Sequence, residues 1–154
     1  MANIKCIASD FDYTLSHFED PIEKGLYDIL RRRGWNDIDI RKAENLAGAQ
    51  GFSIQKFIES AKSLRSELPI PDESSITLVF ERWLNKSIEM YDDSARFLKK
   101  WWGVLPIVIV TIGDQLYQRQ KISLVQLSYD ELHVVTPPNR KVDVLRSTIE
   151  RYGA

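Results

Sequence analysis

Asp10-Phe11-Asp12-Tyr13-Thr14-Leu15 follows directly on the apolar run from Ile4 to Ser9. The run has the length and composition of a buried strand, so the sequence predicts a β-strand that ends in two carboxylates, Asp10 and Asp12. In parallel α/β sheets, ligands bind at the carboxyl ends of the strands. Two acids at positions i and i+2 also face the same side of an extended chain. One carboxylate could then attack an electrophile while the other moves protons, unless both are solvated turn residues.

Two further apolar runs are followed by polar residues. The run from Leu105 to Val110 leads into Thr111-Ile112-Gly113-Asp114, a hydroxyl residue followed by a glycine turn. The run 132–136 is followed by Lys141, at the start of a helix predicted over 142–152. The acid pair, the hydroxyl and the lysine are therefore predicted to converge on one edge of a parallel sheet.

This ordered set resembles the haloacid dehalogenase-like (HAD) phosphohydrolase superfamily, whose first three motifs are D-x-D-x-T, a strand-terminal Thr or Ser, and a Lys. The resemblance covers nearly the whole chain. It implies an α/β fold with a Rossmann-like parallel sheet and an inserted α-helical cap. The core domain would comprise residues 1–17 and 93–154, and the cap domain residues 18–92. In the family the cap closes over the active site and supplies much of the substrate selectivity.

The resemblance also implies a role for each site residue. Asp10 would be the nucleophile that becomes an aspartyl-phosphate, and Asp12 would protonate the leaving oxygen and then activate water. Thr111, Ile112 and Lys141 would bind the phosphate, and Lys141 would also hold the nucleophile. Mg²⁺ would bind through the Asp10 carboxylate and the main-chain carbonyl of Asp12. The implied function is that of a Mg²⁺-dependent phosphatase acting on a small phosphoester.

Two choices within this scheme depend on single residues. After Thr111 a helix is predicted over 115–121, with Asp114 as its amino-terminal cap. Lys121, at the end of this helix, is an alternative to Lys141 as the catalytic lysine, but Lys141 follows the third strand, as in the family. The carboxylate of Asp12 favours a phosphatase over a haloacid dehalogenase, because an alkoxide leaving group needs a proton donor and a halide does not.

About 85 residues with helical periodicity separate the first predicted strand from the second. One helix is predicted over 40–46, before Gly48 interrupts it. Ser53 is predicted to cap the next helix, and Ser74 or Ser75 the longest one. The aromatic residues of this longest helix recur at helical spacing, which favours a buried core stripe over a substrate cage.

The family's fourth motif, a strand ending in acids of the G-D-x-x-x-D type, has no counterpart after Lys141. The only acids there are Asp143 and Glu150, both inside the predicted helix. On this ground we expect the chain to bind Mg²⁺ weakly and to be a poor or inactive catalyst. In the family the first strand lies between the second and the fourth, so residues 5–9 are predicted to form an exposed edge that pairs with a second copy in a homodimer or with a partner fragment.

Composition argues against several other classes of protein. The chain has 154 residues, of which 44% are hydrophobic, enough for one moderate core or a small core with a subdomain. Its 21 basic and 22 acidic residues are interspersed, so we expect no nucleic-acid partner. No apolar run reaches the length of a membrane span, and the amino terminus lacks a signal pattern, so we expect no membrane partner and a cytoplasmic location. The single cysteine, Cys6, is predicted to pack within the first strand.

Two alternative functions are open at this stage. The chain could be a catalytically silent binding or regulatory module that keeps the HAD motifs without the metal site. It could also be a phosphoacceptor receiver domain, whose sheet gathers acids, a Thr and a Lys in the same order. The long helical insert argues against a receiver, because a receiver has no room for a lobe between its first acids and its next strand.

Overall fold

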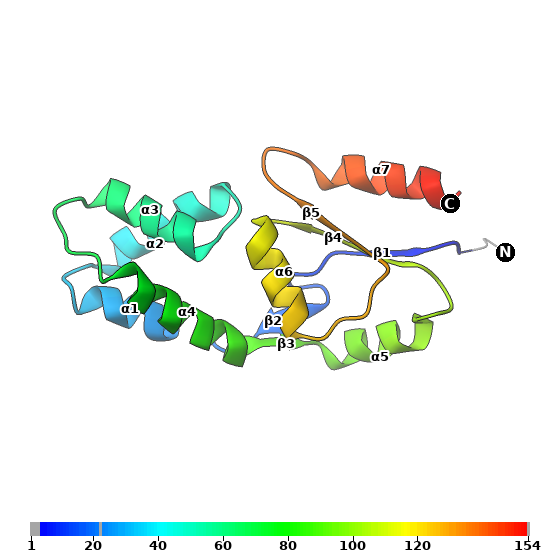
Figure 1. Cartoon of the computed structure of the whole chain (residues 1–154), viewed down its shortest axis with the longest axis horizontal. Coiled ribbons are helices and arrows are strands. Elements are labelled where there is room, and N and C mark those ends of the chain that lie inside the picture. Colours follow the sequence, from blue (N-terminus) through cyan, green and yellow to red (C-terminus); the bar gives the residue numbers. More distant parts are fainter. Residues whose placement is uncertain (1–3, 22, 154) are drawn as a thin grey trace. The chain divides into compact units, whose positions relative to one another are not determined.

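A computed structural model describes residues 4–21 and 23–153 of the chain (Figure 1). The chain divides into two compact units. One comprises the residues up to His17 together with those from Ile88 onward, and the other comprises Phe18–Ser87. The first unit holds the sheet and the predicted site residues, and the second is built from helices.

The first unit is built around a parallel sheet of three strands, β1 (Ile7–Ser9), β4 (Ile107–Ile112) and β5 (Glu131–Val135), in the order β1-β4-β5. The central strand β4 is apolar and buried over nearly its whole length, as expected for a parallel strand covered on both faces. The predicted α/β fold with a Rossmann-like parallel sheet is confirmed.

Three helices belong to this unit, and two of them flank the sheet on opposite sides (Figure 1). Val108, Val110 and Val135 form a buried cluster with Leu145 of α7 (Lys141–Tyr152). Because side chains alternate along a strand, Thr111 faces the other side of β4, where α6 (Gln115–Leu124) lies. The third helix, α5 (Asp92–Trp101), leads into β4 and buries Leu98.

The second unit contains four helices, α1 (Glu23–Arg31), α2 (Asp37–Ala49), α3 (Ile54–Leu64) and α4 (Glu73–Ser87). Helix α1 packs on α4, and α2 packs on α3. The aromatic stripe of α4 is buried, as predicted, with Phe80 and Trp83 only 2% and 8% exposed. Among the described residues, no helix is both long and apolar enough to cross a lipid bilayer.

The structure corrects two predicted helix boundaries in this unit. Helix α2 begins before Ile40, because the Asn36 side chain accepts a hydrogen bond from the Asp39 amide, and it continues through Gly48. Helix α4 is capped by Asp72, whose carboxylate accepts from the amides of Ser74 and Ser75, so neither serine is the cap. The cap predicted for α3 is confirmed, since the Ser53 hydroxyl accepts from the Lys56 amide.

The first strand is shorter than predicted, because β1 begins at Ile7. Ile4 is exposed, and Cys6 is half-buried just before the strand, so the prediction that Cys6 packs within it was wrong. The sequence also missed a two-stranded sheet formed by β2 (Ser16–Phe18) and β3 (Ile88–Met90). Strands of three residues show too little alternation to be distinguished from loops.

Glu131 ties the start of β5 to the end of α7. Its carboxylate lies 2.5 Å from the Tyr152 hydroxyl, 2.5 Å from the Arg151 guanidinium and 3.0 Å from the His133 ring. The hydrogen bond from Tyr152, followed by those from His133 and Arg151, lowers the pKa of Glu131 from 4.5 to about 2. The carboxylate therefore stabilises the fold above pH 4.5, and this contribution is lost as the pH falls through about 2.

We expect Glu131→Gln to lower the free energy of unfolding by about 1–2 kcal/mol at neutral pH, because a neutral amide replaces the charged acceptor of the three hydrogen bonds. The difference from the unaltered chain should shrink as the pH falls from 4.5 towards 2. Urea unfolding curves recorded at several pH values measure this difference. A deficit that stays constant over the whole range would contradict the assigned role of the charge.

Candidate active site

Asp10 follows β1 directly and forms an ion pair with Lys141, the first residue of α7. The Lys141 Nζ lies 2.5 Å from Asp10 Oδ2. The Phe11 amide donates to Asp10 Oδ1 at 2.7 Å, which fixes the second oxygen. The Asp10 and Lys141 side chains are 39% and 25% exposed, so this pair is accessible to a ligand.

Asp12 lies beyond the end of β1, in a turn held by hydrogen bonds within residues 11–16. The amides of Leu15 and Ser16 donate to the Phe11 carbonyl, and Tyr13 adopts a left-handed backbone with φ 56°. The Asp12 side chain forms contacts different from those of Asp10. Its Oδ1 lies 2.5 Å from the Lys121 Nζ, and its Oδ2 accepts from Gln118 Nε2 at 2.9 Å.

Lys121 projects from the buried face of α6 and is only 4% exposed. Burial lowers the pKa of Lys121 below its ordinary value, because removal from water disfavours the ammonium form. The negative charge of Asp12, and more weakly that of Asp10, acts in the opposite direction. Since both carboxylates act on one ammonium, the two acids and Lys121 share one electrostatic environment.

Thr111 lies inside β4, one residue before the end of the strand, and is 1% exposed. Within the described part of the chain its hydroxyl oxygen has no hydrogen-bond partner. Ile112 ends β4, and its carbonyl accepts from Gln118 Nε2 at 2.8 Å. The turn that follows starts α6, where the Asp114 carboxylate accepts from the amides of Leu116 and Tyr117, as predicted for a helix cap.

The structure therefore places the two predicted carboxylates in two separate ion pairs. Asp10 pairs with Lys141 and Asp12 with Lys121, so the two candidate lysines contact different carboxylates. Gln118, to which the sequence assigned no role, bridges Asp12 and the carbonyl of Ile112. A sequence signal existed, because Gln118 and Lys121 are three residues apart and share one face of the predicted helix.

A magnesium ion would find oxygen ligands here. The resemblance implies the Asp10 carboxylate and the Asp12 main-chain carbonyl as its protein ligands. The side-chain oxygens already accept from Lys141 and the Phe11 amide at Asp10, and from Lys121 and Gln118 at Asp12. Mg²⁺ in proteins commonly uses one or two carboxylates and takes its other ligands from water and substrate phosphate, and this donor set fits that pattern. Among residues 4–21 and 23–153, no three His, Cys, Asp or Glu side chains form a cluster that could hold a metal by themselves.

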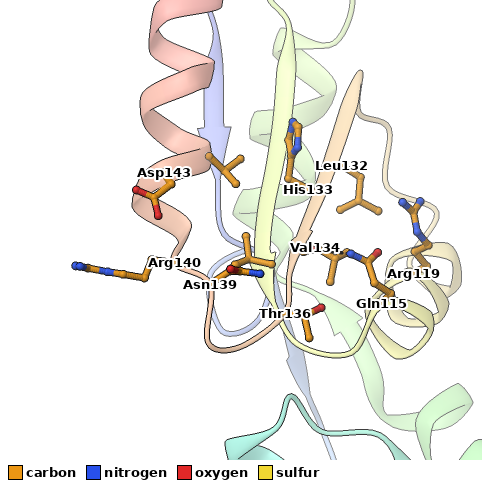
Figure 2. A pocket seen from close by; sticks show the side chains of 11 residues that line it. Gln115, Arg119, Leu132, His133, Val134, Thr136, Asn139, Arg140 and Asp143 are labelled. Carbon is orange, nitrogen blue, oxygen red and sulfur yellow. Dashed lines mark hydrogen bonds between the residues drawn. The ribbon is translucent and has the colours of Figure 1, made fainter.

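A cavity of about 480 Å³ lies at the outer edge of β5 (Figure 2). Figure 2 shows Arg140 and Asp143 on the α7 side of this strand and Gln115 and Arg119 on the α6 side. The Gln115 side chain donates to the Val134 carbonyl at 2.7 Å. None of the predicted site residues lines this cavity, so it is separate from the two ion pairs.

Neither the scan against protein-family models nor the search among curated proteins found a match. Solved structures do match. A haloacid dehalogenase-like family hydrolase from Xanthomonas campestris has a TM-score of 0.66 at 19% identity, covering 97% of this chain and 68% of that one. A HAD family enzyme from Bacteroides thetaiotaomicron, solved with magnesium and inorganic phosphate, has a TM-score of 0.62 at 9% identity, covering 98% and 80%.

An L-2-haloacid dehalogenase from Xanthobacter autotrophicus, with chloropropionic acid covalently bound, is also similar. Its TM-score is 0.55 at 17% identity, and the match covers 99% of this chain and 66% of that one. The structures that match thus include a phosphate-bound HAD enzyme and a dehalogenase. They show that the chain has the HAD-like fold, as its motifs predicted.

Proposed function

We propose that this chain is a Mg²⁺-dependent phosphohydrolase that cleaves a small phosphoester through an aspartyl-phosphate on Asp10. The observation that carries this proposal is the pairing of Asp10 with Lys141 at the carboxyl end of β1, with a second carboxylate, Asp12, two residues away. A nucleophile, a cation for the phosphoryl oxygens and a group that transfers protons are the parts that such a reaction requires.

In the first step a carboxylate oxygen of Asp10 forms a bond to phosphorus while the bond from phosphorus to the ester oxygen breaks. Asp12 enters this step in its protonated form, gives the ester oxygen its proton and becomes a carboxylate. In the second step water attacks the phosphorus and loses a proton to Asp12, and the bond to Asp10 breaks. Lys141 balances the charge on the phosphoryl oxygens, and the hydroxyl of Thr111 is available to donate to one of them. Bound Mg²⁺ would supply further charge neutralisation through the Asp10 carboxylate and the Asp12 carbonyl.

The chemistry of Asp12 supports a phosphoester rather than a haloacid substrate. An alkoxide or phenoxide leaving group needs a proton, and a halide leaves without one. The fold alone does not distinguish these reactions, because the structures it matches include a haloacid dehalogenase. The presence of a carboxylate at position 12 therefore decides the proposed substrate class.

We expect the purified chain to release phosphate from p-nitrophenyl phosphate at saturating Mg²⁺, but slowly, because the Asp10 carboxylate and the Asp12 carbonyl alone would hold the metal. Chelation with EDTA should lower the rate by at least about 100-fold, because the phosphoryl oxygens lose a divalent charge. Restoring Mg²⁺ should restore the rate. Phosphate release that is insensitive to EDTA would contradict the metal dependence. The lack of any release from a panel of sugar, nucleotide and aryl phosphates would contradict the proposed function.

A second candidate function is phosphate binding without turnover, as in a regulatory module. The observation that favours it is that each carboxylate is paired with a lysine. The lysines neutralise the negative charge that would repel phosphate, and in such a module the ion pair with Lys141 would keep Asp10 from acting as a nucleophile. Calorimetric titration with inorganic phosphate separates the two functions. Binding of phosphate by a chain that hydrolyses none of the panel would support the binding module.

A further inference from the structure

The buried face of α6 carries two polar side chains that converge on one carboxylate. Gln118 and Lys121 are 3% and 3% exposed, and both contact Asp12. Lys121 holds one carboxylate oxygen and Gln118 holds the other, at 2.5 Å and 2.9 Å. The two contacts together fix the plane of the Asp12 carboxyl group, because a single contact would leave it free to rotate about its bond to the chain.

The turn at Gly113 leaves room for the Gln118 side chain to reach Asp12. The side-chain Nε2 of Gln118, which donates to Asp12, also donates to the Ile112 carbonyl at 2.8 Å, so this one group joins Asp12 to the end of β4. A Cβ atom built on Gly113 would lie 2.6 Å from Gln118 Nε2 and 3.0 Å from its Cγ. Gly113 also has a φ of +153°, which side-chain-bearing residues rarely adopt. The glycine turn after β4 therefore provides the space that Gln118 occupies.

Folding alone is a weak reason for this arrangement. Lysine is rarely buried, and an ion pair removed from water often contributes no more stability than apolar residues of similar size would. Gln118 adds a cost of its own, because within the described chain its Oε1 is buried without a hydrogen-bond partner. What the arrangement does achieve is a fixed direction for the Asp12 carboxyl group.

We propose that Gln118 and Lys121 are positioning residues that orient the Asp12 carboxyl group for proton transfer to the leaving oxygen. This inference rests on the proposed function and assigns a task to two residues outside its catalytic set. Neither residue needs to touch the substrate. Without these contacts the Asp12 carboxyl group would remain in the site, but it would transfer its proton to the leaving oxygen more slowly.

The test uses leaving groups that differ in their need for a proton. Dinitrophenolate leaves without protonation, whereas the alkoxide of glycerol phosphate must be protonated. The quantity to compare is kcat/KM, because it covers the steps up to departure of the leaving group and excludes the later attack of water, which is common to all substrates. The variants are Lys121→Met and Gln118→Met in the full chain with Mg²⁺. Arg119→Met, an exposed position on the same helix, is the matched control.

We expect Lys121→Met to lower kcat/KM for glycerol phosphate at least about tenfold more than for dinitrophenyl phosphate, since general acid catalysis contributes about 10²–10⁴-fold. Gln118→Met should show the same preference with a smaller ratio, and Arg119→Met should show none. The ratio is measured within one sample, so a partly unfolded variant lowers both rates and leaves the ratio unchanged.

The other outcomes distinguish a failure of the positioning role from a failure of the proposed phosphatase function. Equal losses for the two substrates, or no loss for either, would overturn the positioning role while leaving the phosphatase intact. A loss confined to dinitrophenyl phosphate would also overturn it. If the unaltered chain hydrolysed neither substrate, the proposed function would fail first, and the positioning role would fail with it.

Discussion

Replacement of Asp10 with Asn should lower the rate of phosphate release by at least about 10³-fold, because an amide oxygen cannot form the aspartyl-phosphate. The side chains of Asp and Asn have nearly the same size, so the loss can be assigned to chemistry rather than to packing. The substitution also removes the charge that pairs with Lys141. Initial rates with p-nitrophenyl phosphate under saturating Mg²⁺ measure the effect.

The covalent intermediate offers an independent check of the same prediction. Acid quenching during turnover of a radiolabelled substrate should leave phosphate on the unaltered chain and none on Asp10→Asn. Circular dichroism of both proteins shows whether the variant is folded. A folded Asp10→Asn variant that retains a tenth or more of the rate would exclude Asp10 as the nucleophile.

Replacement of Lys141 with Met should lower kcat by about 10²-fold, which corresponds to about 2.7 kcal/mol of transition-state stabilisation. The ammonium group lies 2.5 Å from Asp10 Oδ2 and is one-quarter exposed, so it can contact both the nucleophile and the incoming phosphoryl group. Methionine keeps most of the length of the side chain and removes the charge. Steady-state rates with Mg²⁺ present measure the loss.

Arg146 provides the matched control for Lys141. It lies on the same helix, is largely exposed, and its ion pair with Asp143 is long, at 3.8 Å. Arg146→Met should leave kcat within about twofold of the unaltered chain, since an exposed ion pair of this kind contributes little. If both variants lost activity equally, the effect of Lys141→Met would reflect the general charge of α7 rather than a contact with the reacting group.

The sequence predicted the fold well where strong local signals coincide. The three apolar runs became the three strands of the sheet, and the helices after the second and third strands begin where predicted or within one residue of it. The caps at Ser53 and Asp114 were also predicted, because each serves its own helix through contacts two or three residues away. Such short-range contacts can be read from the order of residues.

The contact of Lys141 with Asp10 is the one that the resemblance implied, but the contact of Lys121 with Asp12 was not predicted. Lys121 and Lys141 both follow strands of the same sheet, and only the placement of α6 and α7 on opposite sides separates their contacts. The role of Gln118 was missed for a related reason, since its contact with Asp12 joins residues 106 positions apart. Helix α2 was predicted too short because Gly48 was given more weight than the cap at Asn36, and glycine costs a helix only about 1 kcal/mol.

Under the proposed function, the hydroxyl of Thr111 would couple the stability of the fold to the ligand that the site binds. A valine would fill the same space in β4 without an oxygen, and a buried hydroxyl that lacks a partner costs about 1–3 kcal/mol. A visiting phosphoryl oxygen that accepted this hydrogen bond would remove the cost, and the gain would add to the affinity for that ligand. The protein would then be more stable with phosphate bound than without it.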